Sequence, residues 1–145
     1  MIHNMIKKIV KFIIKYAVLF IMGGLVYCGI ELMWRGRTHI SSFIMGGIAI
    51  LVVGGLNEGY DWDMPVWYQM LLSSLFITAM EYVVGINFNT DYHIWDYREL
   101  WLNVDGQICF GYSLLWGLLG LVGILLDDFI RWVFFGEEKP KYKWI

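Results

Sequence analysis

Four long apolar stretches divide this chain, and short polar segments separate them. The apolar stretches cover residues 16–30, 40–56, 64–86 and 108–126. A helix that crosses a bilayer needs roughly 20 mostly apolar residues, within a range of about 17–25. The alternating pattern of a membrane β-barrel is absent. Because lipid accepts only helices or closed barrels, the pattern predicts an all-α, polytopic membrane protein built as a bundle of four transmembrane helices.

The polar segments set the expected helix ends. Pro65 suits the first turn of a helix, because the missing N–H of proline has no helical partner at that position. Tryptophans such as Trp62 and Trp101 fall near the expected ends, as in the aromatic belts of membrane proteins. We expect one integral membrane domain over residues 1–145, with helices at about 9–33, 40–57, 65–86 and 106–128 and a long outer loop at 87–105.

Basic residues are shared unequally between the two sides of this topology. The two ends of the chain carry Lys7, Lys8, Lys11, Lys15, Arg131, Lys139, Lys141 and Lys143. The loops of the opposite side carry Arg35, Arg37 and Arg98. Cytoplasmic segments are enriched in Lys and Arg, so we expect both termini in the cytoplasm. We expect the membrane to be a bacterial plasma membrane.

Composition supports the membrane assignment and excludes several functions. The chain of 145 residues is 59% hydrophobic and 17% charged, whereas soluble domains average about 45–50% and 25%. A net charge of −2 offers no basic surface for nucleic acid. Cys28 and Cys109 lie apart in apolar stretches, which favours packing over chemistry. The sequence contains no ATP-binding loop and no hydrolase motif, so we expect no enzyme activity, no cofactor and no metal.

Small and polar residues recur at steps of three and four in each apolar stretch. The last stretch, for example, contains Gly106, Cys109, Ser113, Gly117 and Gly120. Such spacing places them on one helix face, and small faces let membrane helices approach closely. We interpret these faces as packing within a compact bundle or as the seam of a homo-oligomer, in preference to the lining of a pore.

Glu81 is the strongest single candidate for a functional residue. It lies about five residues before the expected end of its helix, roughly 8 Å inside. A carboxylate there costs on the order of 2 kcal/mol or more unless it is paired or protonated. Glu31 and Arg35 lie at the same level and are spaced to form an ion pair.

We hypothesise that polar residues converge on the outer side of the bundle. These residues are Glu31, Arg35, Glu81, Asp96, Arg98, Asn103 and Gln107. One interpretation is a binding site. The other is that these groups satisfy one another and hold the long loop on the bundle.

The inner side carries two acidic segments. Asp127 and Asp128 end the last helix, where we expect them to be solvated, and Arg131 can offset their unfavourable position at a helix C-terminus. The turn with Glu58, Asp61 and Asp63 lacks the ligand number and the glycine of a calcium-binding loop.

Four short motifs resemble a known bacterial family. They are Thr78-Ala79-Met80-Glu81-Tyr82, Trp95-Asp96-Tyr97, Asn103-Val104-Asp105-Gly106-Gln107-Ile108-Cys109 and Trp116-Gly117-Leu118-Leu119-Gly120. In order and spacing, over about residues 27–126, they are similar to the family labelled "putative ABC-transporter type IV", which is related to the transmembrane protein 229 group. The resemblance marks Glu81, Trp95, Asp96, Tyr97, Asn103, Gly106, Ile108, Cys109, Trp116 and Gly117, and thereby adds Trp95 and Tyr97 to the candidate site.

The chain departs from the family pattern at two places. Arg98 follows the Trp-Asp-Tyr motif where the family usually has serine, and residues 42–55 replace a segment rich in glycine and proline.

Two functions remain open from the sequence. The first is a small transport-type membrane component whose polar groups, at the outer ends of the first, third and fourth helices, contact a solute or ion. The second is a structural or regulatory membrane protein that binds lipid or a partner protein and transports nothing. The expected surroundings are the lipid bilayer, with further copies of the chain or other membrane subunits as partners. The family name alone suggests a separate ATPase.

Overall fold

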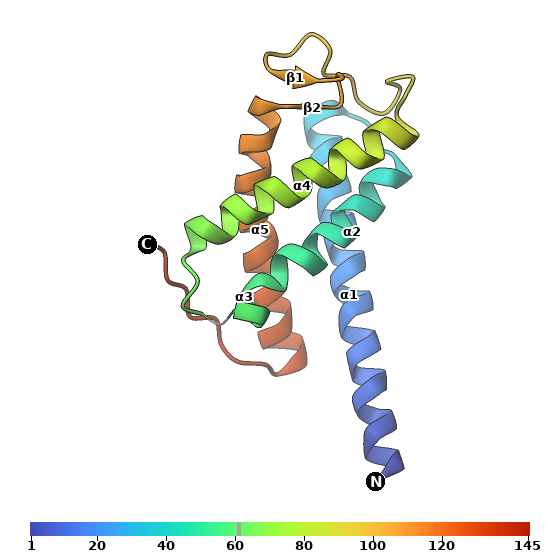
Figure 1. Ribbon diagram of the computed structural model, residues 1–145. Helices are drawn as coiled ribbons and strands as arrows, with labels where there is room; N and C mark the ends of the chain where they lie inside the picture. Colours follow the sequence, from blue (N-terminus) through green and yellow to red (C-terminus); the bar gives the residue numbers. More distant parts are fainter. Residues whose placement is uncertain (61) are drawn as a thin grey trace.

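The computed structural model describes residues 1–60 and 62–145, which fold into a bundle of four long helices (Figure 1). The long helices are α1 (Ile2–Arg35), α2 (Ile40–Gly54), α4 (Val66–Phe88) and α5 (Phe110–Phe135). A short helix, α3 (Leu56–Tyr60), follows α2. Four segments are long and apolar enough to cross a membrane. The predicted fold class, an all-α polytopic membrane protein with four transmembrane helices, is confirmed.

The helix ends differ from the expected ones at several points. α1 starts at Ile2, so the lysine-bearing segment before residue 9 is helical as well. α2 ends at Gly54, and the short α3 completes the segment expected up to residue 57. α5 starts at Phe110 instead of 106 and continues to Phe135, where Gly136 ends it in the left-handed conformation. The connection between α4 and α5 therefore covers residues 89–109.

A two-stranded hairpin accounts for the late start of α5. Strands β1 (Asn103–Val104) and β2 (Ile108–Cys109) pair antiparallel, with Asn103 opposite Cys109. Asp105 and Gly106 have φ of 53° and 66°, and Gln107 N–H donates to Val104 C=O at 3.0 Å. Two successive positive φ angles define a tight hairpin turn, which Asp-Gly adopts readily.

Glycines bring the helices together, and Gly120 among them belongs to the predicted stripe of the last helix, whereas Gly106 and Cys109 of that stripe precede α5. A Cβ on Gly23 of α1 would lie 2.4 Å from Ile50 Cγ2 and 2.7 Å from the carbonyl oxygen of Gly46 on α2. A Cβ on Gly120 of α5 would lie 2.4 Å from Ser73 Cβ on α4. Apolar side chains gain little by leaving lipid, so this close backbone approach is a main source of helix association in a membrane.

The bundle has two different ends, which we call the loop end and the tail end. The loop end contains residues 36–39 and the connection 89–109, which lies over the ends of the helices (Figure 1). The tail end contains residues 55–60, 62–65 and the C-terminal tail, 136–145, whose Lys143 C=O accepts a hydrogen bond of 2.7 Å from Val66 N–H. The N-terminal part of α1 projects beyond the bundle on the tail side (Figure 1).

Candidate functional site

The seven residues predicted to converge gather at the loop end together with Trp95 and Tyr97, but the nine form separate groups. Glu31 pairs with Arg35, Glu81 bonds Tyr97, Trp95 bonds Gln107, and Asp96 pairs with Arg98. Asn103 lies in the hairpin and bonds only its own loop among the described residues.

Glu81 is buried and doubly hydrogen-bonded. Its side chain is 5% exposed. Tyr97 OH donates to Glu81 Oε1 at 2.9 Å, and Trp116 Nε1 donates to Oε2 at 2.9 Å. Burial raises the pKa of Tyr97 well above its usual value, and the nearby Glu81 carboxylate raises it further, so the phenol remains a donor. The carboxylate thus joins the loop to α4 and α5. Trp116 was absent from the predicted site, although the family resemblance had marked it.

Glu31 and Arg35 connect α1 to both loops of this end. Arg35 forms an ion pair with Glu31 one turn earlier and donates from Nη1 to the carbonyl oxygen of Ile94 at 3.2 Å. Thr38 Oγ1 donates to Glu31 Oε1 at 2.9 Å. The Glu31 side chain is 5% exposed, whereas that of Arg35 is 24% exposed. The exposed part of this pair is therefore cationic.

A buried amide pair fixes the start and the end of the connection 89–109. Asn89 Nδ2 donates to Gln107 Oε1 at 3.0 Å, and Gln107 Nε2 donates back to the Asn89 carbonyl oxygen at 2.9 Å. Asn89 also bonds Ile94 N–H and the carbonyl oxygen of Trp95, and Trp95 Nε1 donates to the Gln107 carbonyl oxygen at 2.9 Å. Asn89 was missed, because an asparagine after a helix is common and carries no further signal.

Asp96 and Arg98 are exposed on the loop, and Asn103 is half-buried in it. Arg98 makes two side-chain hydrogen bonds to Asp96, at 2.7 and 2.9 Å, and lies over the ring of Tyr92 at 4.2 Å. These bonds lower the pKa of Asp96 to about 2. Asn103 Oδ1 accepts from Gly106 N–H at 2.9 Å. Among the described residues, these side chains bond within the loop, so they shape the loop itself.

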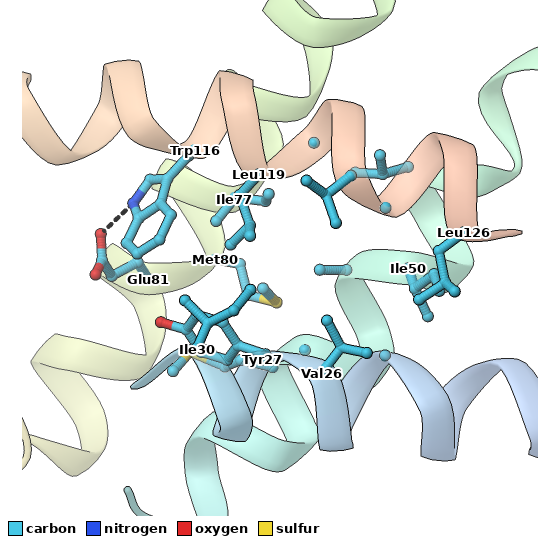
Figure 2. A pocket seen from close by; sticks show the side chains of 18 residues that line it. Val26, Tyr27, Ile30, Ile50, Ile77, Met80, Glu81, Trp116, Leu119 and Leu126 are labelled. Carbon is cyan, nitrogen blue, oxygen red and sulfur yellow. Dashed lines mark hydrogen bonds between the residues drawn. The ribbon is translucent and has the colours of Figure 1, made fainter. Parts of the chain in front are cut away.

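A small cavity of about 60 Å³ lies at the centre of the bundle. Figure 2 shows its wall, in which apolar side chains such as Ile77, Met80 and Leu119 surround the space and Glu81 lies at one side with its hydrogen bond to Trp116. The volume exceeds the minimum for one water molecule. It is far below the roughly 300–1,000 Å³ of ordinary ligand pockets.

A larger groove of about 290 Å³ lies between α1 and α5 near the loop end. α1 packs mainly on α2, and α5 mainly on α4, so these two helices leave space between them. Several lining side chains are also exposed at the surface, among them Trp34, Leu115 and Leu118, so the groove opens sideways. Its lining consists of Tyr27, Ile30, Glu31, Trp34, Arg35, Tyr97, Tyr112, Leu115, Trp116, Leu118, Leu119 and Val122.

The polar and aromatic parts of the groove lie at its loop end. Arg35 and Glu31 are the charged residues of its lining. Tyr97 and Tyr112 stack with ring centroids 4.6 Å apart, and Trp34 Nε1 donates to Tyr112 OH at 3.3 Å. The groove is thus polar near the loops and apolar toward the middle of the bundle. The sequence showed no sign of it, because the groove depends on how far α1 and α5 diverge.

The expectation that Asp127 and Asp128 are solvated is wrong. They are 0% and 2% exposed, because α5 continues to Phe135 and the C-terminal tail folds back over it. Arg131 is the compensating charge, as expected, and donates from Nε to Asp127 Oδ2 at 2.8 Å. Of the acidic turn, Glu58 lies near these carboxylates, whereas Asp61 lies outside the described residues.

Comparison with protein families matches residues 38–136 to the family described as "Putative ABC-transporter type IV". Comparisons with curated proteins and with solved structures find no significant match. The matched segment includes α2, α4, the whole connection 89–109 and α5. It leaves out the whole of α1, and with it one side of the groove. Because the match covers more than half of the sequence, the chain belongs to the family "Putative ABC-transporter type IV".

Proposed function

We propose that this protein is a membrane component of a transport-type assembly and that it holds a phospholipid in the groove between α1 and α5. The observation that carries the proposal is the groove itself, which is about 290 Å³ in volume and opens between two membrane-spanning helices. A space of this size is at the lower end of ligand pockets and fits one acyl chain better than a bulky solute. Lipid is also the molecule that surrounds such an opening.

The polarity of the groove supports a phospholipid in one orientation. Arg35 exposes part of its guanidinium at the loop end, whereas the carboxylate of Glu31 is buried. Arg37 follows on the exposed surface of the same loop. Guanidinium groups bind phosphate through paired hydrogen bonds. A phospholipid would therefore place its phosphate near Arg35 and its chain along Leu115, Leu118 and Val122.

Groove-filling variants test this proposal. Leu115→Trp adds a ring to the groove, whereas Leu114→Trp adds the same ring at a neighbouring exposed position that is part of neither cavity. Both variants would be purified from the same membranes, and native mass spectrometry would measure the phospholipid that remains bound. We expect the wild type and Leu114→Trp to retain phospholipid and Leu115→Trp to lose most of it.

Two results would contradict the lipid assignment. The first is equal retention in all three proteins. The second is a wild-type protein without phospholipid whose dimer is broken by Leu115→Trp alone, because the groove would then be a contact between copies of the chain. A homo-oligomer whose contacts lie outside the groove is compatible with the proposal, and so is a separate ATPase.

A second candidate function is transport of a polar solute or ion past Glu81. The observation in its favour is the position of this carboxylate at the wall of the central cavity (Figure 2). Flux into vesicles that contain the purified protein would test it, with Glu81→Gln and Asp96→Asn as variants. Loss of flux in a Glu81→Gln protein that still assembles would favour transport. Loss of assembly would favour a structural role.

The orientation and the absence of enzyme activity belong to the same proposal. We place both termini in the cytoplasm, on the excess of Lys and Arg at the tail side, and the groove mouth on the outer side. We assign no catalytic step to the chain.

A further inference from the structure

A group of acidic side chains lies at the tail end, away from the groove. It comes from two elements, with Glu58 on α3 and Asp127 and Asp128 on α5. One carboxylate oxygen of each residue lies within 4.8 Å of the others. Asp127 and Asp128 are buried, whereas Glu58 is exposed. Two carboxylates of the group are therefore buried, and solvent can reach the third.

Hydrogen bonds from the described residues reach only one oxygen of each buried carboxylate. Asp127 Oδ2 accepts from Arg131 Nε at 2.8 Å. Asp128 Oδ2 accepts from Asn57 Nδ2 at 2.7 Å and from Tyr142 OH at 2.8 Å. Gly54 makes room for this arrangement, because a Cβ at that position would lie 2.2 Å from Asp127 Cγ.

The remaining oxygens are buried without a hydrogen bond from the described residues. They are Asp127 Oδ1, Asp128 Oδ1 and Asn57 Oδ1, and each belongs to a side chain that is at most 3% exposed. Buried polar atoms in native proteins almost always have a partner, and an ion is one of the usual partners when the protein supplies none. The three oxygens belong to adjacent side chains and are all acceptors, so a partner common to them would be a donor or a cation.

The charge of the group favours a cation. Three carboxylates face one guanidinium, Arg131. Arg131 is itself shared, since its Nη1 lies 3.7 Å from Glu137 Oε2. Lys15 pairs with Glu137. The carboxylates therefore keep an excess of negative charge that a divalent ion would neutralise.

We propose that Glu58, Asp127, Asp128 and the side-chain oxygen of Asn57 bind a hard divalent cation, Ca²⁺ or Mg²⁺. Calcium takes oxygen ligands at about 2.3–2.6 Å, so two of its ligands are at most about 5 Å apart. The carboxylate oxygens all lie within 4.8 Å of one another, which is inside this limit. Magnesium, with bonds of about 2.0–2.1 Å, would need water for some of these positions. This site departs from the expectation of no metal drawn from the sequence.

A bound cation would connect the segment after α2 to α5. Asn57 and Glu58 follow α2, and Asp127 and Asp128 belong to α5. Tyr142 brings the C-terminal tail to the same carboxylate. The cation would therefore stabilise the tail end of the bundle, independently of any lipid in the groove.

The thermal stability of the purified protein in detergent tests the proposal. After treatment with a chelator, the melting temperature would be measured with CaCl₂ or MgCl₂ added up to about tenfold above the roughly 10⁻³ M of the weakest calcium sites. KCl of equal ionic strength is the salt control. We expect one of the two divalent ions to raise the melting temperature by several degrees, since a ligand that binds only the folded state stabilises it.

Two variants separate binding from general salt effects. Glu58→Gln removes an exposed ligand and leaves the buried part intact, whereas Asp63→Asn removes an exposed carboxylate outside the group. Calorimetric titration with the metal alone should show Glu58→Gln to bind at least about tenfold more weakly, because affinity follows the number of charged ligands. Asp63→Asn should bind like the wild type.

The proposal is overturned if neither calcium nor magnesium stabilises the wild-type protein more than KCl does. It is equally overturned if Glu58→Gln and Asp63→Asn bind the ion alike. Stability that rises only on acidification, with no effect of metal, would identify protons as the partners of the free oxygens.

Discussion

Removing either hydrogen-bond donor of Glu81 should destabilise the bundle. Tyr97→Phe and Trp116→Phe each delete one of the two donors, whose bonds to the carboxylate are both 2.9 Å long. Because Glu81 is 5% exposed, water does not replace the lost donor freely. Leaving a buried acceptor unpaired costs about 1–3 kcal/mol, and more when it is charged.

The expected change is large enough to measure by thermal unfolding. For a chain near 150 residues, about 1 kcal/mol corresponds to a shift of roughly 2–4 °C, so each variant should melt several degrees below the wild type. Tyr82→Phe is the matched control, because Tyr82 OH also donates to a carboxylate, that of Asp105 at 2.7 Å, but at the surface of the same end. The free energy of unfolding of Tyr82→Phe should stay within about 0.5 kcal/mol of the wild-type value.

Glu81→Gln completes this experiment. A glutamine can still accept a hydrogen bond from Trp116 and can donate one to the Tyr97 oxygen. Glu81→Gln should therefore destabilise the protein less than the loss of either donor does. Tyr97→Phe should then cost less in the Glu81→Gln background, with a coupling of about 0.5–3 kcal/mol. If Tyr97→Phe, Trp116→Phe and Tyr82→Phe all melt with the wild type, Glu81 does not hold the loop, and the structural account of this residue is refuted.

Three further predictions concern the loop, the packing and the pH response. Asn89→Ala leaves several buried hydrogen-bond partners unpaired, and each unpaired group costs about 1–3 kcal/mol of stability. Limited proteolysis should therefore cut the connection 89–109 faster than in the wild type. Equal cleavage rates would contradict the role of Asn89. Gly120→Ala forces a Cβ against Ser73 and should lower the melting temperature by an overpacking cost of about 1–3 kcal/mol, whereas Gly111→Ala, with open space around it, should not. The pKa of Asp96 is lowered to about 2 in the folded chain, below the usual value of about 3.9, so its contribution to stability is present above pH of about 4 and is lost as pH falls toward 2. Asp96→Asn should therefore melt slightly below the wild type at neutral pH and together with it near pH 2, and a difference that persists unchanged at pH 2 would contradict this sign.

The sequence predicted the membrane fold well, because apolar length is a direct consequence of bilayer thickness. It also placed Glu31 with Arg35 correctly, since a spacing of four on one helix needs no tertiary information. The start of α5 was missed because Asp105-Gly106, a hairpin signal, was placed at the boundary between the expected loop and the expected helix. Weighing that dipeptide as a turn would have found β1 and β2.

The sequence predicted which candidate residues lie at the loop end but not how they are arranged. Glu81 was singled out correctly as buried and in need of partners, yet which donors reach it depends on how the loop lies on α5. Asp127 and Asp128 were misjudged, because their burial results from the C-terminal tail and from Gly54, both remote in sequence. The groove likewise depends on the divergence of α1 and α5 and has no local signature.

The central claim, that a phospholipid occupies the groove between α1 and α5, is tested most directly by photo-crosslinking in vesicles. A phospholipid with a photoreactive group at the end of one acyl chain would be mixed with the protein and irradiated, and mass spectrometry would locate the modified residues. A phospholipid in the groove would concentrate the modification at Leu115, Leu118 and Val122. The modification of Leu118 and Val122 would then disappear in Leu115→Trp. Modification spread evenly over lipid-facing residues such as Leu75, Val83 and Leu114, with no response to Leu115→Trp, would contradict this claim.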